Sequence, residues 1–285
     1  MPPADPTVEV PVWVRAAFGH AVVQHLADEI GVDVLHLKGA ATDLDLRTRP
    51  EGGSDADVLV RPAHMPGLLA AMSAHGWSRY SVFETGSAFE HATTVQHPDF
   101  VYADLHRIVP GFDADPEAAF ETLWNRREQR EIAGHPCWVP DRAGQVLVRV
   151  FNETRSGRRR RWTGEEIDAL LPDGHDLPGL VDALDAHVAM GAAMGELERY
   201  RGRRTYWLWK IQVEDSTRVQ EWLARMRAAG TVRGALRVAL RAPLVNVDRL
   251  SHQLGHPPSR AEVAREFVAR PARGVREEWA RWRSR

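Results

Sequence analysis

The hydrophobic pattern of this chain changes near residue 140. Before that point, apolar runs of strand length alternate with segments of helical periodicity and are separated by glycine and proline. From Arg142 onward, apolar residues recur at helical spacing almost to the end of the chain. This change predicts an α/β domain over residues 1–140, followed by an all-helical domain over residues 141–285.

Individual elements can be predicted in both regions. In the first region we expect helices over 11–30 and 63–75, a short helix from Lys38 to about Leu46, strands over 32–37, 55–60, 77–83, 89–96 and 100–106, and short β-rich pieces near 129–139. The first helix should present one apolar face, formed by Val14, Phe18, Ala21, Val22, His25 and Leu26. In the second region we expect helical segments near 142–155, 164–171, 177–200, 205–228, 231–240, 246–254 and 259–268.

Composition excludes several classes of protein. A hydrophobic fraction of 44% supplies enough apolar side chains for a core, so a disordered chain is not expected. No apolar run approaches the roughly 18 residues of a membrane-spanning helix, and the N-terminus lacks the pattern of a secretory signal. Cys137 is the one cysteine, so neither an internal disulfide nor a cysteine zinc site is expected. We therefore expect a cytoplasmic protein without a membrane partner.

The charged residues are distributed unevenly, although the whole chain has a net charge of only -2. Residues 1–150 contain 12 basic and 21 acidic side chains, whereas residues 151–285 contain 25 and 18. An acidic half followed by a basic half indicates two regions with different surfaces. The basic half would suit a triphosphate or a nucleic acid.

Two carboxylates lie at the start of the predicted strand 55–60. Because residues i and i+2 of a strand point to the same face, Asp55 and Asp57 should lie side by side. Their mutual repulsion would be relieved by a hard cation such as Mg²⁺, which prefers oxygen ligands. Asp104, on the polar face of the predicted strand 100–106, is the best candidate for a third ligand. These residues predict a metal site, although each could also be a solvated strand or turn residue.

A glycine turn precedes this acidic pair. Gly39 follows the predicted strand 32–37 and opens a helix, and Lys38 places a mobile cation beside it. Glycine at such a turn lets backbone N–H groups approach an anion. The turn therefore predicts a phosphate site, and together with the carboxylates it indicates phosphoryl or nucleotidyl transfer. Ordinary turn chemistry is the alternative interpretation of Gly39, and a surface cation that of Lys38.

These motifs resemble the uncharacterised nucleotidyltransferase family of the DNA polymerase beta-like superfamily. The matching segments are Leu-Lys-Gly-Ala-Ala at 37–41, Ser-Asp-Ala-Asp-Val-Leu-Val at 54–60 and Ala-Asp-Leu-His at 103–106. The resemblance covers about residues 30–110, a little over a quarter of the chain. It implies an α+β fold with a polymerase beta-like nucleotidyltransferase core, in which a mixed sheet is flanked by helices, followed here by the helical domain.

The resemblance also implies roles for individual residues. It implies that Asp55, Asp57 and Asp104 are catalytic and bind metal, with one or two Mg²⁺ ions as cofactor and a nucleoside triphosphate such as ATP as substrate. The residues that would contact the nucleotide are Lys38, Gly39, Ala40, Arg49 and Ser54. Ala40 departs from the family pattern, because serine or glycine is preferred there. The loop over 49–54 is about two residues longer than usual, so Arg47 is a second candidate for the family's arginine.

The predicted activity is Mg²⁺-dependent transfer of a nucleoside monophosphate to a hydroxyl acceptor, most plausibly a small molecule or a protein. The helical domain would then close over the acceptor and the nucleotide. Two alternatives from other classes stay open. One is a toxin-like transferase that modifies tRNA or another RNA, although nucleic acid is not the favoured partner. The other is a non-catalytic module that binds a nucleotide. The sequence indicates no particular oligomeric state.

Three segments of the second region allow two interpretations each. The run Arg158–Arg161 could grip phosphates, although a solvated helix end is the more common role for such a run. The aromatic segment Tyr206–Lys210 could stack a base, but aromatic residues in a helical domain more often form its core. The basic segment Arg270–Arg285 could be an amphipathic helix that docks on its own domain, or a tail that binds an acidic partner.

Overall fold

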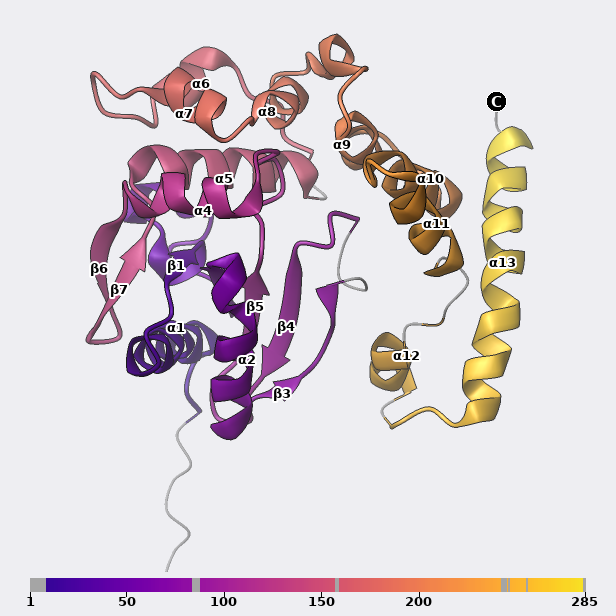
Figure 1. Ribbon diagram of the computed structural model, residues 1–285, viewed down its shortest axis with the longest axis horizontal. Coiled ribbons are helices and arrows are strands. Elements are labelled where there is room, and N and C mark those ends of the chain that lie inside the picture. Colours follow the sequence, from indigo (N-terminus) through magenta and orange to yellow (C-terminus); the bar gives the residue numbers. More distant parts are fainter. Residues whose placement is uncertain are drawn as a thin grey trace, which may run out of the picture. The chain divides into compact units, whose positions relative to one another are not determined.

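The structure is a computed structural model of the chain and describes residues 9–83, 88–156, 159–241, 245, 247–254 and 256–283 (Figure 1). These residues form two compact units. The first unit contains the described residues up to 79, together with 93–108 and 116–145. The second contains the described residues of 80–92, 109–115 and those from 146 onward. The second unit thus includes two short segments that precede the predicted domain boundary at residue 140.

Within the described residues, the first unit is built on a five-stranded sheet with the strand order β1-β2-β5-β4-β3. The strands are β1 (Val34–Leu37), β2 (Asp55–Val60), β3 (Ser78–Arg79), β4 (Ala92–Gln96) and β5 (Tyr102–His106). β1 is antiparallel to β2 and β3 is antiparallel to β4, whereas β2 and β5 are parallel. The expected α+β class with a mixed sheet is therefore confirmed.

The predicted strand bounds are right for β2 and too long elsewhere. Val32 does not belong to β1, because its N–H donates to the carbonyl of Ala27 and so closes the end of the preceding helix. The segment predicted as a strand over 77–83 pairs only at Ser78 and Arg79. Trp77 is excluded because its N–H donates back to the carbonyl of Met72. The predicted strands 89–96 and 100–106 begin later, at Ala92 and Tyr102.

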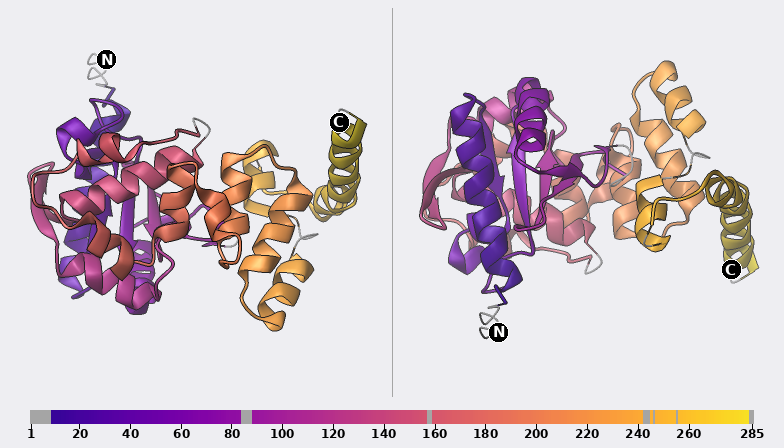
Figure 2. Two further views of the ribbon diagram at one scale, coloured as in Figure 1. Left: turned by 90° about the horizontal axis from the view of Figure 1, so that it is seen from above. Right: turned by 90° about the horizontal axis from the view of Figure 1, so that it is seen from below.

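Three helices and a hairpin complete the first unit: α1 (Val12–Glu29), α2 (Met65–Ala74), α4 (Pro116–Trp124) and the antiparallel pair β6 (Glu128–Ile132) and β7 (His135–Val139). α1 packs against β2 and β7, and Figure 2 shows it running alongside the sheet. The hairpin confirms the β-rich pieces predicted near 129–139. Its two turn residues, Ala133 and Gly134, both have positive φ, as a tight two-residue turn requires. The predicted short helix near residue 40 is two 3₁₀ turns, Gly39–Ala41 and Leu44–Leu46.

The face predicted for α1 is right only in part, because Ala21 and Leu26 are buried as expected but other members of the face are not. Phe18 is 47% exposed and His25 is also exposed, whereas the buried positions include the polar residues His20 and Gln24. The cause is the close approach of α1 to the sheet at Gly19. A Cβ at Gly19 would lie 3.2 Å from Cγ2 of Val101, so a larger side chain does not fit at this position. Apolar periodicity alone therefore identified only part of the packed face.

Helices dominate the described part of the second unit, as predicted. They are α5 (Arg142–Arg155, whose first turn belongs to the first unit), α6 (Gly164–Asp168), α7 (Leu177–Ala183), α8 (His187–Ala193), α9 (Tyr206–Val213), α10 (Arg218–Ala228), α11 (Val232–Arg241), α12 (Val247–Leu254) and α13 (Arg260–Arg283). The predicted segment 205–228 is two helices, because the Thr217 side chain caps a new start through a reciprocal pair of hydrogen bonds with Gln220. The predicted segment 177–200 is also divided, into α7, α8 and a 3₁₀ turn over Leu197–Tyr200. Among the described residues, no helix combines the length and the apolar character needed to cross a membrane.

Contacts within the second unit favour the structural interpretation of two of its ambiguous segments. Tyr206 and Trp209 are fully buried, so the aromatic segment contributes to the core. Arg158 lies outside the described residues. Arg159 forms an ion pair with Asp215, and Arg160 pairs with Glu153 and Glu166 and stacks on the ring of Trp162. The charges of Arg159 and Arg160 are thus already matched by carboxylates.

Candidate active site

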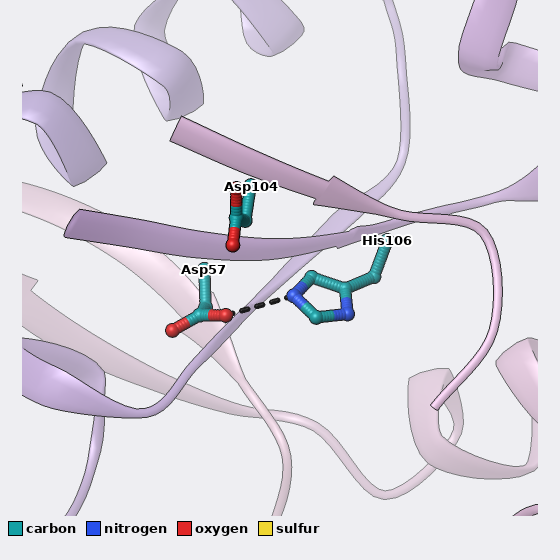
Figure 3. Close-up of side chains that lie close together, drawn as sticks. All are labelled: Asp57, Asp104 and His106. Carbon is teal, nitrogen blue, oxygen red and sulfur yellow. Dashed lines mark hydrogen bonds and ion pairs between the residues drawn. The ribbon is translucent and has the colours of Figure 1, made fainter. Parts of the chain in front are cut away.

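The pairing of two parallel strands assembles the acidic site. In the register between β2 and β5, Asp57 lies directly opposite Asp104, and Asp55 lies two residues earlier on the same face of β2. His106 lies two residues after Asp104 and so joins that face from β5. Figure 3 shows the Asp104 carboxylate and the His106 ring, both carried by β5, near Asp57 on the adjacent strand. The structure therefore brings together the three carboxylates that the sequence singled out.

Asp57 is the buried centre of this site, with only 5% of its surface exposed. Its Oδ1 accepts two hydrogen bonds, from Lys38 Nζ at 2.6 Å and from His106 Nε2 at 2.8 Å. Burial alone would raise the pKa of Asp57, but the Lys38 charge and the His106 hydrogen bond hold that pKa well below its usual range. Asp57 is therefore ionised, and both contacts leave its second oxygen, Oδ2, unused.

The pKa of Asp55 is shifted in the opposite direction to that of Asp57. Burial, together with the negative charges of Asp57 and Asp104, raises its pKa to about 6. Lys38 acts in the other direction but does not compensate for these effects. The site thus holds more negative charge than its own cations neutralise, which is the condition under which a bound cation stabilises a cluster of carboxylates.

The sequence did not single out His106 as a site residue. Ligand atoms of Asp57, Asp104 and His106 all lie within 4.8 Å of one another, and this group does not include Asp55. The alternation of polar residues along 102–106 placed His106 on the same face as Asp104. Its hydrogen bond to Asp57 depends on the register between β2 and β5, which the sequence does not encode locally. Asp104 is held in turn by Thr94 of β4, whose Oγ1 donates to its Oδ1 at 2.6 Å.

The Lys38–Gly39 turn is packed against the loop that leads into β2. Lys38 has φ 45° and ψ -178°, a strained combination for a residue with a side chain, and Gly39 has φ 52°. A Cβ on Gly39 would lie 3.2 Å from the backbone N of Gly53. A Cβ on Gly52 would lie 3.4 Å from the backbone N of Ala40. The two backbones therefore touch where only glycine fits, and this contact ties the turn to the start of β2.

The two candidate arginines lie in different environments. Arg47 is half-buried and donates from Nε to the carbonyl of Thr42 and from Nη2 to the carbonyl of Ala40, each at 3.0 Å. It forms no ion pair with any carboxylate in the described part of the chain. Arg49 and Ser54 are exposed. Arg47 is thus the arginine that holds the turn, and the predicted nucleotide contacts of Arg49 and Ser54 stay predictions.

The donor set of this site fits Mg²⁺. Asp55, Asp57 and Asp104 offer carboxylate oxygens, the ligands that this ion prefers. The raised pKa of Asp55 indicates that their negative charge is not fully balanced by Lys38. These three aspartates would hold the ion, and His106 would orient Asp57 through the hydrogen bond at Oδ1.

Comparisons with known proteins find solved structures that have low sequence identity and low TM-scores to this chain. No protein-family model and no curated protein sequence matches the chain. Among solved structures, an antigenic nucleotidyltransferase-like protein from Paracoccidioides brasiliensis is 16% identical with a TM-score of 0.35, covering 62% of this chain and 93% of that one. The lincosamide antibiotic adenylyltransferase LnuA, bound to lincomycin, is 14% identical with a TM-score of 0.33, covering 61% and 94%. The structure of ANT(2″)-Ia in complex with adenylyl-2″-tobramycin is 15% identical with a TM-score of 0.36, covering 67% and 99%.

Proposed function

We propose that this protein is a Mg²⁺-dependent nucleotidyltransferase, which moves a nucleoside monophosphate from a nucleoside triphosphate to a hydroxyl group. The observation that carries the proposal is the convergence of Asp55, Asp57 and Asp104 on two adjacent parallel strands, with unbalanced negative charge. The neighbouring Lys38–Gly39 turn supports it, because the partly exposed ammonium group of Lys38 and a glycine at a tight turn suit a phosphate. The acceptor we favour is a hydroxyl group of a small molecule or of a protein.

Each site residue has a role in this proposal. When bound by the three aspartates, Mg²⁺ would offset the charge of the triphosphate and stabilise the charge that develops during transfer. Lys38 and His106 hold Asp57 in place through Oδ1, so its position does not depend on the substrate. Thr94 holds Asp104 through its Oδ1 in the same way. The site is therefore fixed before a nucleotide arrives, which lowers the cost of organising it.

In the proposed transfer, one bond to the α-phosphorus forms as another breaks. The acceptor oxygen forms a bond to the α-phosphorus as the bond to the bridging oxygen of pyrophosphate breaks, and pyrophosphate leaves with the electron pair. The hydroxyl proton passes to a carboxylate. Asp104 is the proposed base, since its Oδ2 takes no part in the bond from Thr94.

A transfer assay tests the proposal directly. The purified protein is incubated with Mg²⁺ and each of the four labelled nucleoside triphosphates, together with a panel of small hydroxyl compounds and an extract of host proteins. We expect one triphosphate to release pyrophosphate and to label an acceptor, and EDTA should abolish both signals. If Mg²⁺ and all four triphosphates give no turnover while one of them still binds, the protein is the non-catalytic module instead.

Arg47 and Arg49 offer a matched pair for testing the nucleotide turn. Arg47→Gln should raise KM for the triphosphate by about 10- to 100-fold, because it removes two charge-assisted hydrogen bonds that hold the turn. Arg49→Gln should change KM by less than about threefold, since its side chain is exposed. Steady-state kinetics on both variants decide the matter. A larger effect at Arg49 than at Arg47 would assign the nucleotide contact to Arg49.

A further inference from the structure

His20 on α1 is a fully buried residue with no role in the mechanism above. Its Nδ1 lies 2.8 Å from Nδ1 of His36 on β1. Its other ring nitrogen, Nε2, is buried as well and has no hydrogen-bond partner among the residues that the structure describes. Buried polar atoms are nearly always paired in folded proteins, so an unpaired one calls for an explanation such as a water, an ion or a functional role.

A chain of hydrogen bonds fixes the protonation of the His20 ring. The Gln24 amide is oriented by its neighbours, because its Nε2 donates to Asp28 Oδ1 at 2.8 Å while its Oε1 accepts from the backbone N–H of Trp138 at 3.2 Å. The contact between Gln24 Oε1 and His36 Nε2 therefore requires the hydrogen on His36. Burial and neighbouring imidazoles lower the pKa of His36, so the ring is neutral and its Nδ1 is an acceptor.

The consequence for His20 follows from that orientation. Its Nδ1 must donate to His36, whether or not the His20 ring carries a charge. The remaining atom, Nε2, is the one that gains or loses a proton. It lies 3.8 Å from the position that a Cβ on Gly39 would take. The titrating atom of His20 is thus directed at the Lys38–Gly39 turn.

The surroundings keep His20 neutral in the free protein. Burial lowers its pKa to about 4, and the negative charge of Asp57 acts in the opposite direction. The strands packed against α1 carry the following ionisable side chains, and Lys38 follows β1: His36 on β1, Asp55 and Asp57 on β2, Tyr102, Asp104 and His106 on β5, Glu128, Arg130 and Glu131 on β6, and His135 and Cys137 on β7. A further anion at the turn would act as Asp57 does and favour the protonated ring.

We propose that His20 takes up a proton on Nε2 when a nucleoside triphosphate binds at the Lys38–Gly39 turn, and so supplies a positive charge beneath the bound phosphates. The proton comes from the solvent, and the hydrogen bond from His20 to His36 is kept in both states. This inference rests on the proposed function, because it requires a nucleotide at that turn. His20 acts through the turn and is therefore a positioning residue.

Calorimetric titration tests this coupling. Each of the four triphosphates is titrated with Mg²⁺ at pH 6 in buffers of different ionisation enthalpy, which gives the number of protons taken up on binding. Asp55 will release protons when the metal binds, so the informative quantity is the difference between proteins. The comparison uses the natural protein, His20→Gln and the control His25→Gln, which alters an exposed histidine on the same helix.

We expect His20→Gln to take up fewer protons than the natural protein, by about half a proton or more, and His25→Gln to match the natural protein. Equal uptake by the natural protein and His20→Gln would overturn the inference while leaving the proposed function intact. If His20→Gln does not fold, the ¹⁵N resonance of Nε2 in the natural protein decides, and an unprotonated Nε2 in the nucleotide complex overturns it. Failure of all four triphosphates to bind would remove the proposed function and this inference with it.

Discussion

Asp57→Asn is expected to abolish nucleotidyl transfer and to destabilise the fold at the same time. Asp57 is buried and accepts hydrogen bonds from Lys38 and His106 on one oxygen. An asparagine carries no charge, so Lys38 is left without its counterion and the metal loses a ligand. Breaking such a buried pair costs about 3–5 kcal/mol of unfolding free energy, and loss of the charge should lower the transfer rate by at least about 10³-fold.

Two measurements check this result. Denaturant unfolding gives the change in free energy, and single-turnover kinetics with Mg²⁺ give the change in rate. Asp99→Asn is the matched control, because that side chain is 83% exposed and the residue belongs to neither β2 nor β5. It should leave both quantities unchanged. Transfer at more than about a tenth of the natural rate in Asp57→Asn would remove Asp57 from the catalytic set.

Asp55→Asn should abolish transfer equally but stabilise the protein. The pKa of Asp55 is raised to about 6 by burial and by the charges of Asp57 and Asp104. Ionised Asp55 therefore destabilises the folded state above pH 6, and an asparagine of the same shape relieves that repulsion. We expect a gain of about 2 kcal/mol in unfolding free energy near pH 7.5. The same measurements of unfolding and of rate apply.

The difference in unfolding free energy between Asp55→Asn and the natural protein should depend on pH. Below pH 6 the folded natural protein binds a proton at Asp55 that the unfolded chain binds only near pH 4. The advantage of Asp55→Asn is therefore complete above pH 6 and disappears as the pH falls toward 4. Mg²⁺ should also raise the melting temperature of the natural protein more than that of the variant. A variant no more stable than the natural protein at pH 7.5 would contradict the charge imbalance described at this site.

The parts of the site that follow from local pattern could be predicted from the sequence. β2 has the predicted bounds, Asp55–Val60, and the spacing of two residues put Asp55 and Asp57 on one face. The contact of Asp57 with His106 could not be predicted, because it depends on which residue of β5 pairs with which residue of β2. The distinction between Arg47 and Arg49 depends likewise on how the loop folds against the turn.

The buried face of α1 shows most clearly what could not be predicted from the sequence. The helix was predicted over 11–30 from its periodicity, yet the residues expected on its apolar face include the exposed Phe18. Its packed face carries small and polar residues, because Gly19 lies against Val101 and His20 bonds to His36. Both contacts join residues far apart in the chain, so the local sequence does not predict them. The buried imidazole pair was accordingly missed.

The contact between the Gly39 turn and Gly53 limits how this protein can diverge during evolution. Gly53 lies within 3.5 Å, measured from its Cβ position, of both Gly39 Cα and the Asp55 carboxylate. A length change in the preceding loop can be absorbed at its exposed residues, such as Arg49 and Glu51, without shifting this junction. An insertion at Gly52 or Gly53 would move the glycine turn and β2 together. During evolution, the length of this loop can therefore vary only at its exposed residues.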